Sequence, residues 1–298
     1  MIAIDLGSNT LRVIEYDCVH KKATYTFEKV VKTADGLVES GMINPAAVCR
    51  VINAIQEAQI QLDFKGQPLR AVTTEALRRA SNAEDVLKEI VEVTGVKFEI
   101  ISGEEEATLT LQAVHQRLDK LHHASDSFVL VDIGGGSTEV TFNHGTKTTT
   151  KSFPIGIVTM AQTYESLENI EKALPREMLD IQMFCAEMYA TQGKPNAFVA
   201  TAGTPTTVAS MKLGFNYKTY DALKINGTSL QKEELDFYLK KLLSMSIDER
   251  EFTVGTGRSD LITAGILIYK QLYTILEFES CVVVDDGLRE GVVFNMCN

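Results

Sequence analysis

Short apolar runs alternate with longer stretches of helical periodicity along the whole chain. Apolar runs of strand length predict strands at residues 2–5, 12–17, 24–31, 69–73, 97–101, 127–132, 138–142, 148–153, 197–201 and 280–284. Apolar positions three and four apart predict helices at residues 45–62, 82–94, 103–119, 156–164, 168–191, 204–213, 231–245, 259–276 and 287–297. This order of elements predicts an α/β fold with a mixed sheet in each of two domains.

One short pattern occurs twice. Asp5 to Thr10 reads Asp-Leu-Gly-Ser-Asn-Thr, and Asp132 to Thr138 reads Asp-Ile-Gly-Gly-Gly-Ser-Thr, each directly after an apolar run. Each copy predicts a strand, a tight turn at glycine and a second strand. A carboxylate at a strand end, followed by small residues whose backbone N–H groups can turn inward, suits the binding of phosphate and its metal. A plain hairpin turn is the alternative for a single copy. Two matched copies indicate a duplicated fold whose halves face one phosphate chain.

The second copy carries three consecutive glycines, Gly134, Gly135 and Gly136. Such a run costs backbone entropy on folding, so it marks positive φ angles or a close approach of the backbone to another group. Asp132 and Glu139 stand at the opposite ends of this loop. Together they could hold a divalent cation, directly or through water, as Mg²⁺ prefers.

Three further motifs each leave a structural and a functional interpretation open. Ser102 and Glu105 match a capping box at a helix start, and this leaves Glu106 without an assigned role. Arg78 or Arg79 follows a predicted strand and could bind phosphate bidentately, or could lie on a solvated helix face. The segment 200–207 runs from a strand into a helix, and its Gly203-Thr204 could bind an anion or simply cap the helix.

A chain of 298 residues fits two domains. The predicted boundary is the polar stretch 119–127, which gives domains of residues 1–120 and 121–298. The net charge of −11 disfavours nucleic acid as a partner, because nucleic-acid-binding proteins usually carry a basic face. A local site can still attract a polyanion.

Five cysteines are scattered without a C-x-x-C pair: Cys18, Cys49, Cys185, Cys281 and Cys297. Their odd number and wide spacing predict reduced, mostly buried thiols in a cytoplasmic protein. No signal peptide or membrane span is expected, because no basic n-region or long apolar run occurs. The five histidines lack metal-ligand spacing, and neither a G-x-S-x-G elbow nor a P-loop lysine motif is present. Nucleophilic serine or cysteine chemistry therefore has little support.

Several motifs, in this order along the chain, resemble the Ppx/GppA family of exopolyphosphatases and guanosine pentaphosphate phosphohydrolases. They are residues 5–10, Ala76-Leu77-Arg78, residues 102–107 and 132–139, Gly203-Thr204, Glu249-Arg250, residues 258–260 with Ala264-Gly265, and residues 286–291. The resemblance covers nearly the whole chain. It implies two actin-like (ribonuclease H-like) domains of the actin/Hsp70/sugar-kinase superfamily, with a cleft between them.

The resemblance also implies roles for individual residues. Glu106 would be the general base that activates water, and Asp132 and Glu139 would hold Mg²⁺ or Mn²⁺. The two loops would bind the terminal phosphates with help from Arg78. The implied phosphate-binding residues are Asp5, Gly7, Ser8, Asn9, Thr10, Arg78, Gly134, Gly135, Gly136, Ser137 and Thr138. Positioning and charge neutralisation are most of what phosphoryl transfer needs.

The expected reaction is hydrolysis of the terminal phosphate of inorganic polyphosphate, guanosine pentaphosphate, or both. Two alternatives stay open: an ATP-dependent kinase of the same superfamily, and a non-catalytic sensor that binds guanosine tetraphosphate. The chain departs from the family at Lys32, where arginine is common, and it stops before the C-terminal helical domains of longer members. The sequence does not decide the preferred substrate, its length, or whether the protein is a homodimer.

Overall fold

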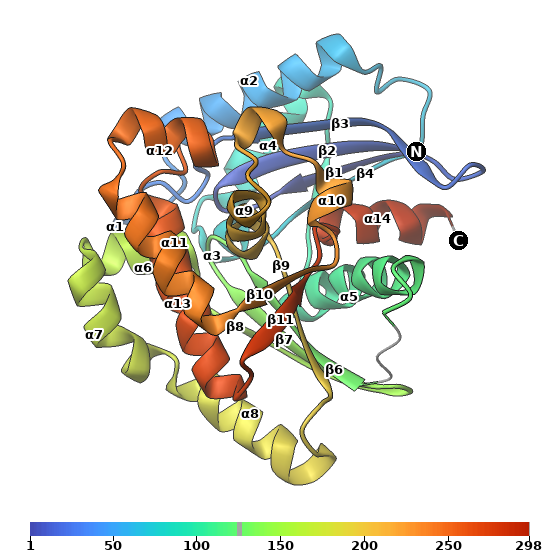
Figure 1. Cartoon of the computed structure of the whole chain (residues 1–298). Coiled ribbons are helices and arrows are strands. Elements are labelled where there is room, and N and C mark those ends of the chain that lie inside the picture. Colours follow the sequence, from blue (N-terminus) through green and yellow to red (C-terminus); the bar gives the residue numbers. More distant parts are fainter. Residues whose placement is uncertain (124–126, 298) are drawn as a thin grey trace. The chain divides into compact units, whose positions relative to one another are not determined.

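The structure is a computed structural model that describes residues 1–123 and 127–297. The chain divides into two compact units, Met1–Ala113 with Leu288–Asn298, and Val114–Gly287. Each unit is built around its own mixed sheet flanked by helices, as the sequence predicts (Figure 1). The predicted boundary stretch 119–127 joins a helix to a strand, and its residues 124–126 lie outside the described residues. No helix in the described ranges is long and apolar enough to cross a bilayer.

The elements of the first unit begin with three antiparallel strands and end with the C-terminal helix. They are β1 (Ile2–Leu6), β2 (Thr10–Asp17), β3 (Lys22–Val30), α1 (Leu37–Ser40), α2 (Pro45–Gln61), β4 (Leu69–Thr73), α3 (Glu75–Arg79), α4 (Ala83–Thr94), β5 (Phe98–Ile100), the first part of α5 (Gly103–Lys120), and α14 (Leu288–Cys297). Their strands lie in the order β3-β2-β1-β4-β5. Strand β1 is buried along its whole length, because it pairs with β2 on one side and with β4 on the other.

The second unit repeats this plan with additional helices. Its elements are the remainder of α5, β6 (Ser127–Ile133), β7 (Thr138–His144), β8 (Lys147–Phe153), α6 (Ile157–Tyr164), α7 (Leu167–Glu177), α8 (Leu179–Gln192), β9 (Ala197–Thr201), α9 (Gly203–Lys212), η1 (Tyr217–Thr219), α10 (Ala222–Ile225), β10 (Thr228–Gln231), α11 (Lys232–Ser244), α12 (Ile247–Val254), α13 (Leu261–Leu276) and β11 (Ser280–Val283). The strand order β8-β7-β6-β9-β11 matches that of the first sheet, and β10 adds an edge. This equivalence confirms the duplicated fold that the repeated motif predicts.

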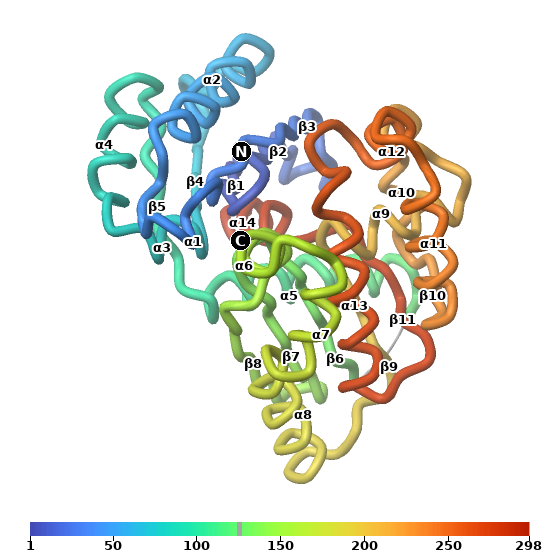
Figure 2. The backbone as a smooth tube through the Cα atoms, turned by 90° about the vertical axis from the view of Figure 1, so that its left-hand side faces the viewer, coloured from blue at the N-terminus to red at the C-terminus, as the bar shows by residue number. Residues whose placement is uncertain are grey.

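Helix α14 departs from the predicted division of the chain. The prediction assigned residues 121–298 to one domain, whereas α14 packs against β1, β2 and β4 of the first unit. Its Val292 and Phe294 are buried in a cluster with Ile14 and Val72 from that sheet. On another side of the first unit, α2 and α4 lie next to each other (Figure 2). Helix α14 therefore covers apolar residues of the first unit's sheet.

A disulfide joins Cys18, just after β2, to Cys297 at the end of α14, with 5.5 Å between their Cα atoms. The prediction that all five cysteines are reduced is therefore wrong. Cys185 and Cys281 are free and buried as predicted, whereas the free Cys49 is exposed. Spacing along the chain did not reveal the bond, because the fold brings together two residues 279 positions apart.

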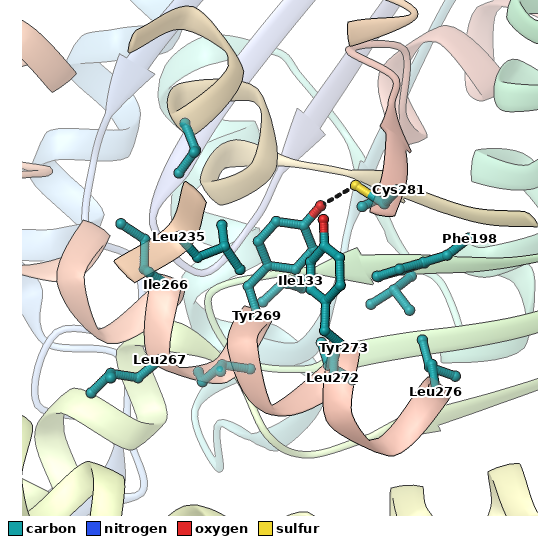
Figure 3. Close-up of a cluster of buried hydrophobic side chains, with 14 of the residues drawn as sticks. Ile133, Phe198, Leu235, Ile266, Leu267, Tyr269, Leu272, Tyr273, Leu276 and Cys281 are labelled. Atoms are coloured by element: carbon teal, nitrogen blue, oxygen red, sulfur yellow. Dashed lines mark hydrogen bonds between the residues drawn. The ribbon is translucent and has the colours of Figure 1, made fainter. Parts of the chain in front are cut away.

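Helix α13 carries the centre of the second unit's core. Tyr269 and Tyr273 project from it toward β11, where the Tyr269 hydroxyl and the Cys281 thiol are 2.5 Å apart (Figure 3). Tyr273 donates a hydrogen bond to the carbonyl of Leu230 on β10 (2.9 Å). These contacts give the hydroxyl groups of both tyrosines a hydrogen-bond partner. A buried polar atom without a partner would destabilise the fold.

Burial of two thiols predicts a loss of stability at alkaline pH. Burial raises the pKa of Cys185 to about 12 and the pKa of Cys281 to about 11, from an ordinary value of 9.0. Above pH 9.0 the unfolded chain therefore releases these protons first, and the free energy of unfolding falls as pH rises. Urea denaturation at neutral pH and above pH 9.0 should show a smaller fall for Cys185→Ala than for the wild type. Cys49→Ala, at an exposed thiol, should keep the wild-type fall, and an unchanged fall in Cys185→Ala would contradict the assignment.

Candidate active site

The two copies of the repeated motif form the same turn. In the first loop, between β1 and β2, the Gly7 amide donates to the Thr10 carbonyl (3.0 Å). In the second loop, between β6 and β7, the Gly134 amide donates to the Ser137 carbonyl (2.9 Å). A Cβ at Gly134 would lie 3.1 Å from the Ser137 carbonyl oxygen, so a side chain there would press on the turn. The predicted order of strand, glycine turn and strand is confirmed for both copies.

The segment that follows β3 supports the first loop through backbone hydrogen bonds. The Asn9 carbonyl accepts hydrogen bonds from the amides of Val31 and Lys32, both at 2.9 Å, and the Ser8 carbonyl accepts from Ala34 (2.8 Å). Lys32 has a φ of 49° and an exposed side chain. A positive φ is strained for lysine, so these hydrogen bonds hold the backbone in a conformation it would otherwise avoid. Asp5 ends up buried at the strand end.

The second loop is held by the start of α6. The amides of Ile157 and Val158 donate to the carbonyls of Gly134 (3.0 Å) and Gly135 (2.8 Å). Gly156, which precedes this helix, lies so close to Gly135 and Gly136 that a Cβ would overlap their backbone atoms. This is the close approach that the run of glycines predicts. Gly156, which makes this contact with the candidate loop, was not singled out from the sequence.

Asp132 and Glu139 lie directly opposite each other on β6 and β7. Residues opposed in an antiparallel pair project from the same face of the sheet, with Cβ atoms about 5 Å apart. Glu139 is buried, and its carboxylate accepts a hydrogen bond from Ser152 (2.7 Å). Two carboxylates on one face fit Mg²⁺, which takes one or two protein carboxylates together with substrate phosphates. Residues 1–123 and 127–297 contain no cluster of three or more histidine, cysteine or acidic side chains that could hold a metal alone.

Arg78 and Glu106, predicted from separate motifs, form an ion pair. The Nη1 of Arg78 lies 3.0 Å from Glu106 Oε2 and also donates to the Ile101 carbonyl (2.8 Å). Its Nε and Nη2 donate to Glu75 Oε2 at 3.1 and 3.0 Å. Burial alone would lower the pKa of Arg78, but the carboxylates of Glu106 and Glu75 outweigh it and raise this pKa. Arg78 is therefore a fixed positive charge beside Glu106.

The helix start before Glu106 differs in part from the predicted capping box. Ser102 caps α5, since its hydroxyl accepts a hydrogen bond from the Glu105 amide (3.1 Å). The Glu105 carboxylate does not occupy the cap, because it pairs with Arg70 (2.7 Å). Hydrogen bonds from its own amide and from Ser102 lower the pKa of Glu104. The three acidic residues thus have three different partners, and Glu106 is the one paired with Arg78.

Comparison with known proteins decides the family. The model of the Ppx/GppA phosphatase family matches residues 19–298. The chain belongs to the Ppx/GppA phosphatase family. This confirms the predicted family and the class of enzyme, a hydrolase, and it favours neither the kinase nor the sensor alternative.

Relatives in this family match the chain over most of their length. The putative exopolyphosphatase of Haemophilus influenzae is 27% identical over 99% of this chain and 90% of its own. Exopolyphosphatase 1 of Mycobacterium leprae is 25% identical over 97% of this chain and 87% of its own. The crystal structure of the Aquifex aeolicus family member is 27% identical, covers 99% of this chain and 96% of that one, and superposes with a TM-score of 0.74. The α/β fold is therefore shared with a solved Ppx/GppA protein.

The start of α9, at Gly203-Thr204, is a further candidate site in this Ppx/GppA protein. Ala202 has a φ of 73°, and Gly203 begins the helix with open space where a Cβ would be. Thr204 is buried, and its hydroxyl oxygen has no hydrogen-bond partner among the described residues. This hydroxyl faces Gly265 on α13, where a Cβ would collide with it. Binding of a nucleotide at Gly203-Thr204 stays a hypothesis.

An ion pair that sequence interpretation missed fixes the segment after β11. Arg117 on α5 binds both carboxylate oxygens of Asp286, at 2.5 and 3.0 Å. Thr201, at the end of β9, donates to the Asp286 carbonyl (2.9 Å). Asp286 belongs to the family-like segment 286–291, but its partner is 169 residues away, so spacing alone offered no signal.

The contact between α6 and the second loop predicts a specific effect of Gly156→Ala. The added methyl group would displace Gly135 and Gly136, so we expect the turnover number to fall by about 10²-fold, a loss that a 1 Å misplacement of reacting groups can cause. Gly291→Ala is a matched control, because its methyl group would collide with the Leu109 carbonyl outside this loop. That control should lower the melting temperature while activity per folded molecule is kept. Gly156→Ala with wild-type turnover would contradict the role of the loop.

Proposed function

We propose that this Ppx/GppA protein removes the terminal phosphate from inorganic polyphosphate, guanosine pentaphosphate, or both, with water as the nucleophile. The observation that carries this proposal is the pair of matched glycine turns, one at the end of β1 and one at the end of β6. Backbone amides in such turns bind phosphate oxygens. The names of the exopolyphosphatase relatives support polyphosphate as the substrate.

Glu106 is the proposed general base. In this reaction water attacks the terminal phosphorus, its proton passes to the Glu106 carboxylate, and the bond from phosphorus to the bridging oxygen breaks. The shortened polyphosphate leaves with the electron pair of that bond. Arg78 holds Glu106 at 3.0 Å and would keep it ionised and oriented. The first loop, with Asp5 and Gly7 to Thr10, and the second loop, with Gly134 to Thr138, are proposed to bind phosphate oxygens.

Asp132 and Glu139 are the proposed ligands of Mg²⁺ or Mn²⁺. Their carboxylates share one face of the second sheet, which supports this assignment. The cation would neutralise charge on the phosphate oxygens, which a protein of net charge −11 needs at a polyanion site. Ser152 would orient Glu139 through the hydrogen bond described above.

Guanosine tetraphosphate as a ligand, a cytoplasmic location and a homodimer remain predictions from the sequence. The free thiols of Cys49, Cys185 and Cys281 support a reducing compartment, whereas the Cys18–Cys297 disulfide is more usual in an oxidising one. The net charge of −11 disfavours nucleic acid as a partner.

Phosphate release measured side by side tests this function. The substrates are tripolyphosphate, long-chain polyphosphate and guanosine pentaphosphate, each with Mg²⁺ and with excess chelator. We expect release from at least one of them with Mg²⁺, and a loss of turnover with chelator. Binding of guanosine tetraphosphate without any phosphate release would favour the sensor. Transfer of phosphate from ATP to a sugar or carboxylate acceptor would favour the kinase.

A further inference from the structure

Glu75 is a partly buried carboxylate that the sequence motifs did not single out. It is the first residue of α3, directly behind the strand end of β4. Its Oε2 accepts two hydrogen bonds from Arg78, from Nε at 3.1 Å and from Nη2 at 3.0 Å. Residues three apart on one helical turn face each other, so this short helix presents Glu75 and Arg78 together.

Arg78 connects Glu75 to Glu106. The guanidinium donates from one side to Glu75 and from the other to Glu106 and the Ile101 carbonyl. The side chains of Glu75, Arg78 and Glu106 are 13%, 18% and 12% exposed. A guanidinium is a rigid, planar fork, so a partner that fixes one edge also fixes the direction of the other. The position of Arg78 at Glu106 therefore depends on Glu75.

We propose that Glu75 is a positioning residue for the reaction, acting on the base Glu106 through Arg78. It directs the Arg78 guanidinium, and it shares the positive charge so that Glu106 keeps enough affinity for the proton of the attacking water. This inference rests on the proposed function, in which Glu106 is the general base.

The charges explain why sharing matters. The Arg78 guanidinium faces the carboxylates of Glu75 and Glu106. Its positive charge therefore stabilises the ionised form of Glu106 only in part. Without the negative charge of Glu75, Arg78 would pair with Glu106 alone. The repulsion between the negative charges of Glu75 and Glu106 would also be lost. Both changes favour the ionised form of Glu106, lower its pKa and make it a weaker base.

Neighbouring charges do not replace Glu75. Arg79, on the same helix, lies 4.0 Å from Glu75 and is 42% exposed, so water weakens its effect. Glu104, on α5, also feels the Arg78 charge, which contributes to its lowered pKa. Its pKa is governed first by its own amide and by Ser102. Arg70 pairs with Glu99 and Glu105. The carboxylate that hydrogen-bonds Arg78 from the side opposite Glu106 is Glu75.

The test compares Glu75→Gln with the wild type and with Glu105→Gln. Glutamine keeps the size of the side chain and removes its charge. We expect Glu75→Gln to lower kcat by about 10- to 100-fold, the range for groups that orient a functional ligand, with KM changed less than kcat. The acidic limb of the kcat profile should move to lower pH. Glu105 is the neighbour of Glu106 in the chain but pairs with Arg70. Glu105→Gln should therefore keep the wild-type kcat and an unshifted pH profile.

A readout without turnover separates this inference from the proposed function. Carbon-13 NMR titration of the Glu106 carboxyl, identified by its absence in Glu106→Gln, should show a lower pKa in Glu75→Gln than in the wild type. A wild type without phosphate release, but with this shift in Glu75→Gln, would defeat the proposed function and retain the coupling. An unchanged Glu106 pKa would overturn the inference. So would a rise in KM at constant kcat, which would show that Glu75 supports substrate binding and not the base.

Discussion

Glu106→Gln should lower kcat by about 10²–10⁴-fold, the usual contribution of a general base. Glutamine keeps the size of the side chain but cannot take the proton of the attacking water. The fold should persist, because Arg78 keeps its hydrogen bonds to Glu75 and to the Ile101 carbonyl. The measurement is steady-state phosphate release, together with calorimetric binding of the substrate and a thermal melt.

Glu105→Gln is the matched control on the same helical turn. Its carboxylate pairs with Arg70 and is 44% exposed, so its loss should leave kcat near that of the wild type. The assignment of the base is wrong if Glu105→Gln abolishes turnover while Glu106→Gln retains it. Unchanged substrate affinity in Glu106→Gln would show that its carboxylate acts on the reaction and not on binding.

Removal of the Cys18–Cys297 disulfide should lower the free energy of unfolding by about 2–5 kcal/mol. The bond closes a loop of almost the whole chain, because its cysteines are 279 positions apart, so it strongly restricts the unfolded chain. It also ties down α14, whose Phe294 ring packs against Tyr16 at 5.2 Å between ring centroids. Urea denaturation of Cys18→Ser, and of the wild type with reductant, measures the effect.

Cys49→Ser is the control for this prediction, since its thiol is free and exposed. It should unfold at the wild-type urea concentration. Identical unfolding of the wild type with and without reductant would show that the bond does not stabilise the protein.

The central strands could be predicted because buried strands appear in the sequence as short apolar runs. Strand β1 is buried at every position, and β4 and β9 have the bounds that the pattern predicts. Strand β10 was missed, because Leu230 is the buried residue of a short edge strand and leaves no apolar run. The helix predicted at 168–191 is two helices, α7 and α8, which meet at Met178 shortly after Pro175. A proline inside a helix removes a backbone hydrogen bond and weakens the helix there.

The turns of the candidate site were predictable, whereas their supports were not. Asp132 and Glu139 could be paired because a strand, a short turn and a strand set their register. Gly156 matters only through contact with a loop some twenty positions earlier, and Arg117 only through Asp286, 169 residues away. Glu75 had no role in the sequence interpretation, and the structure shows it paired with Arg78. Gly156 and Arg117 act through tertiary contacts, and the link from Glu75 to Glu106 also depends on one, the contact between Arg78 and Glu106.

Hydrolysis of tripolyphosphate in water enriched with oxygen-18 tests the central claim most directly. If water attacks the terminal phosphorus, the heavy oxygen will appear in the released orthophosphate, and first-turnover pyrophosphate will carry none. Glu106→Gln should slow this labelled release without moving the label. Label in the pyrophosphate, or phosphate transfer that requires an acceptor other than water, would contradict the account.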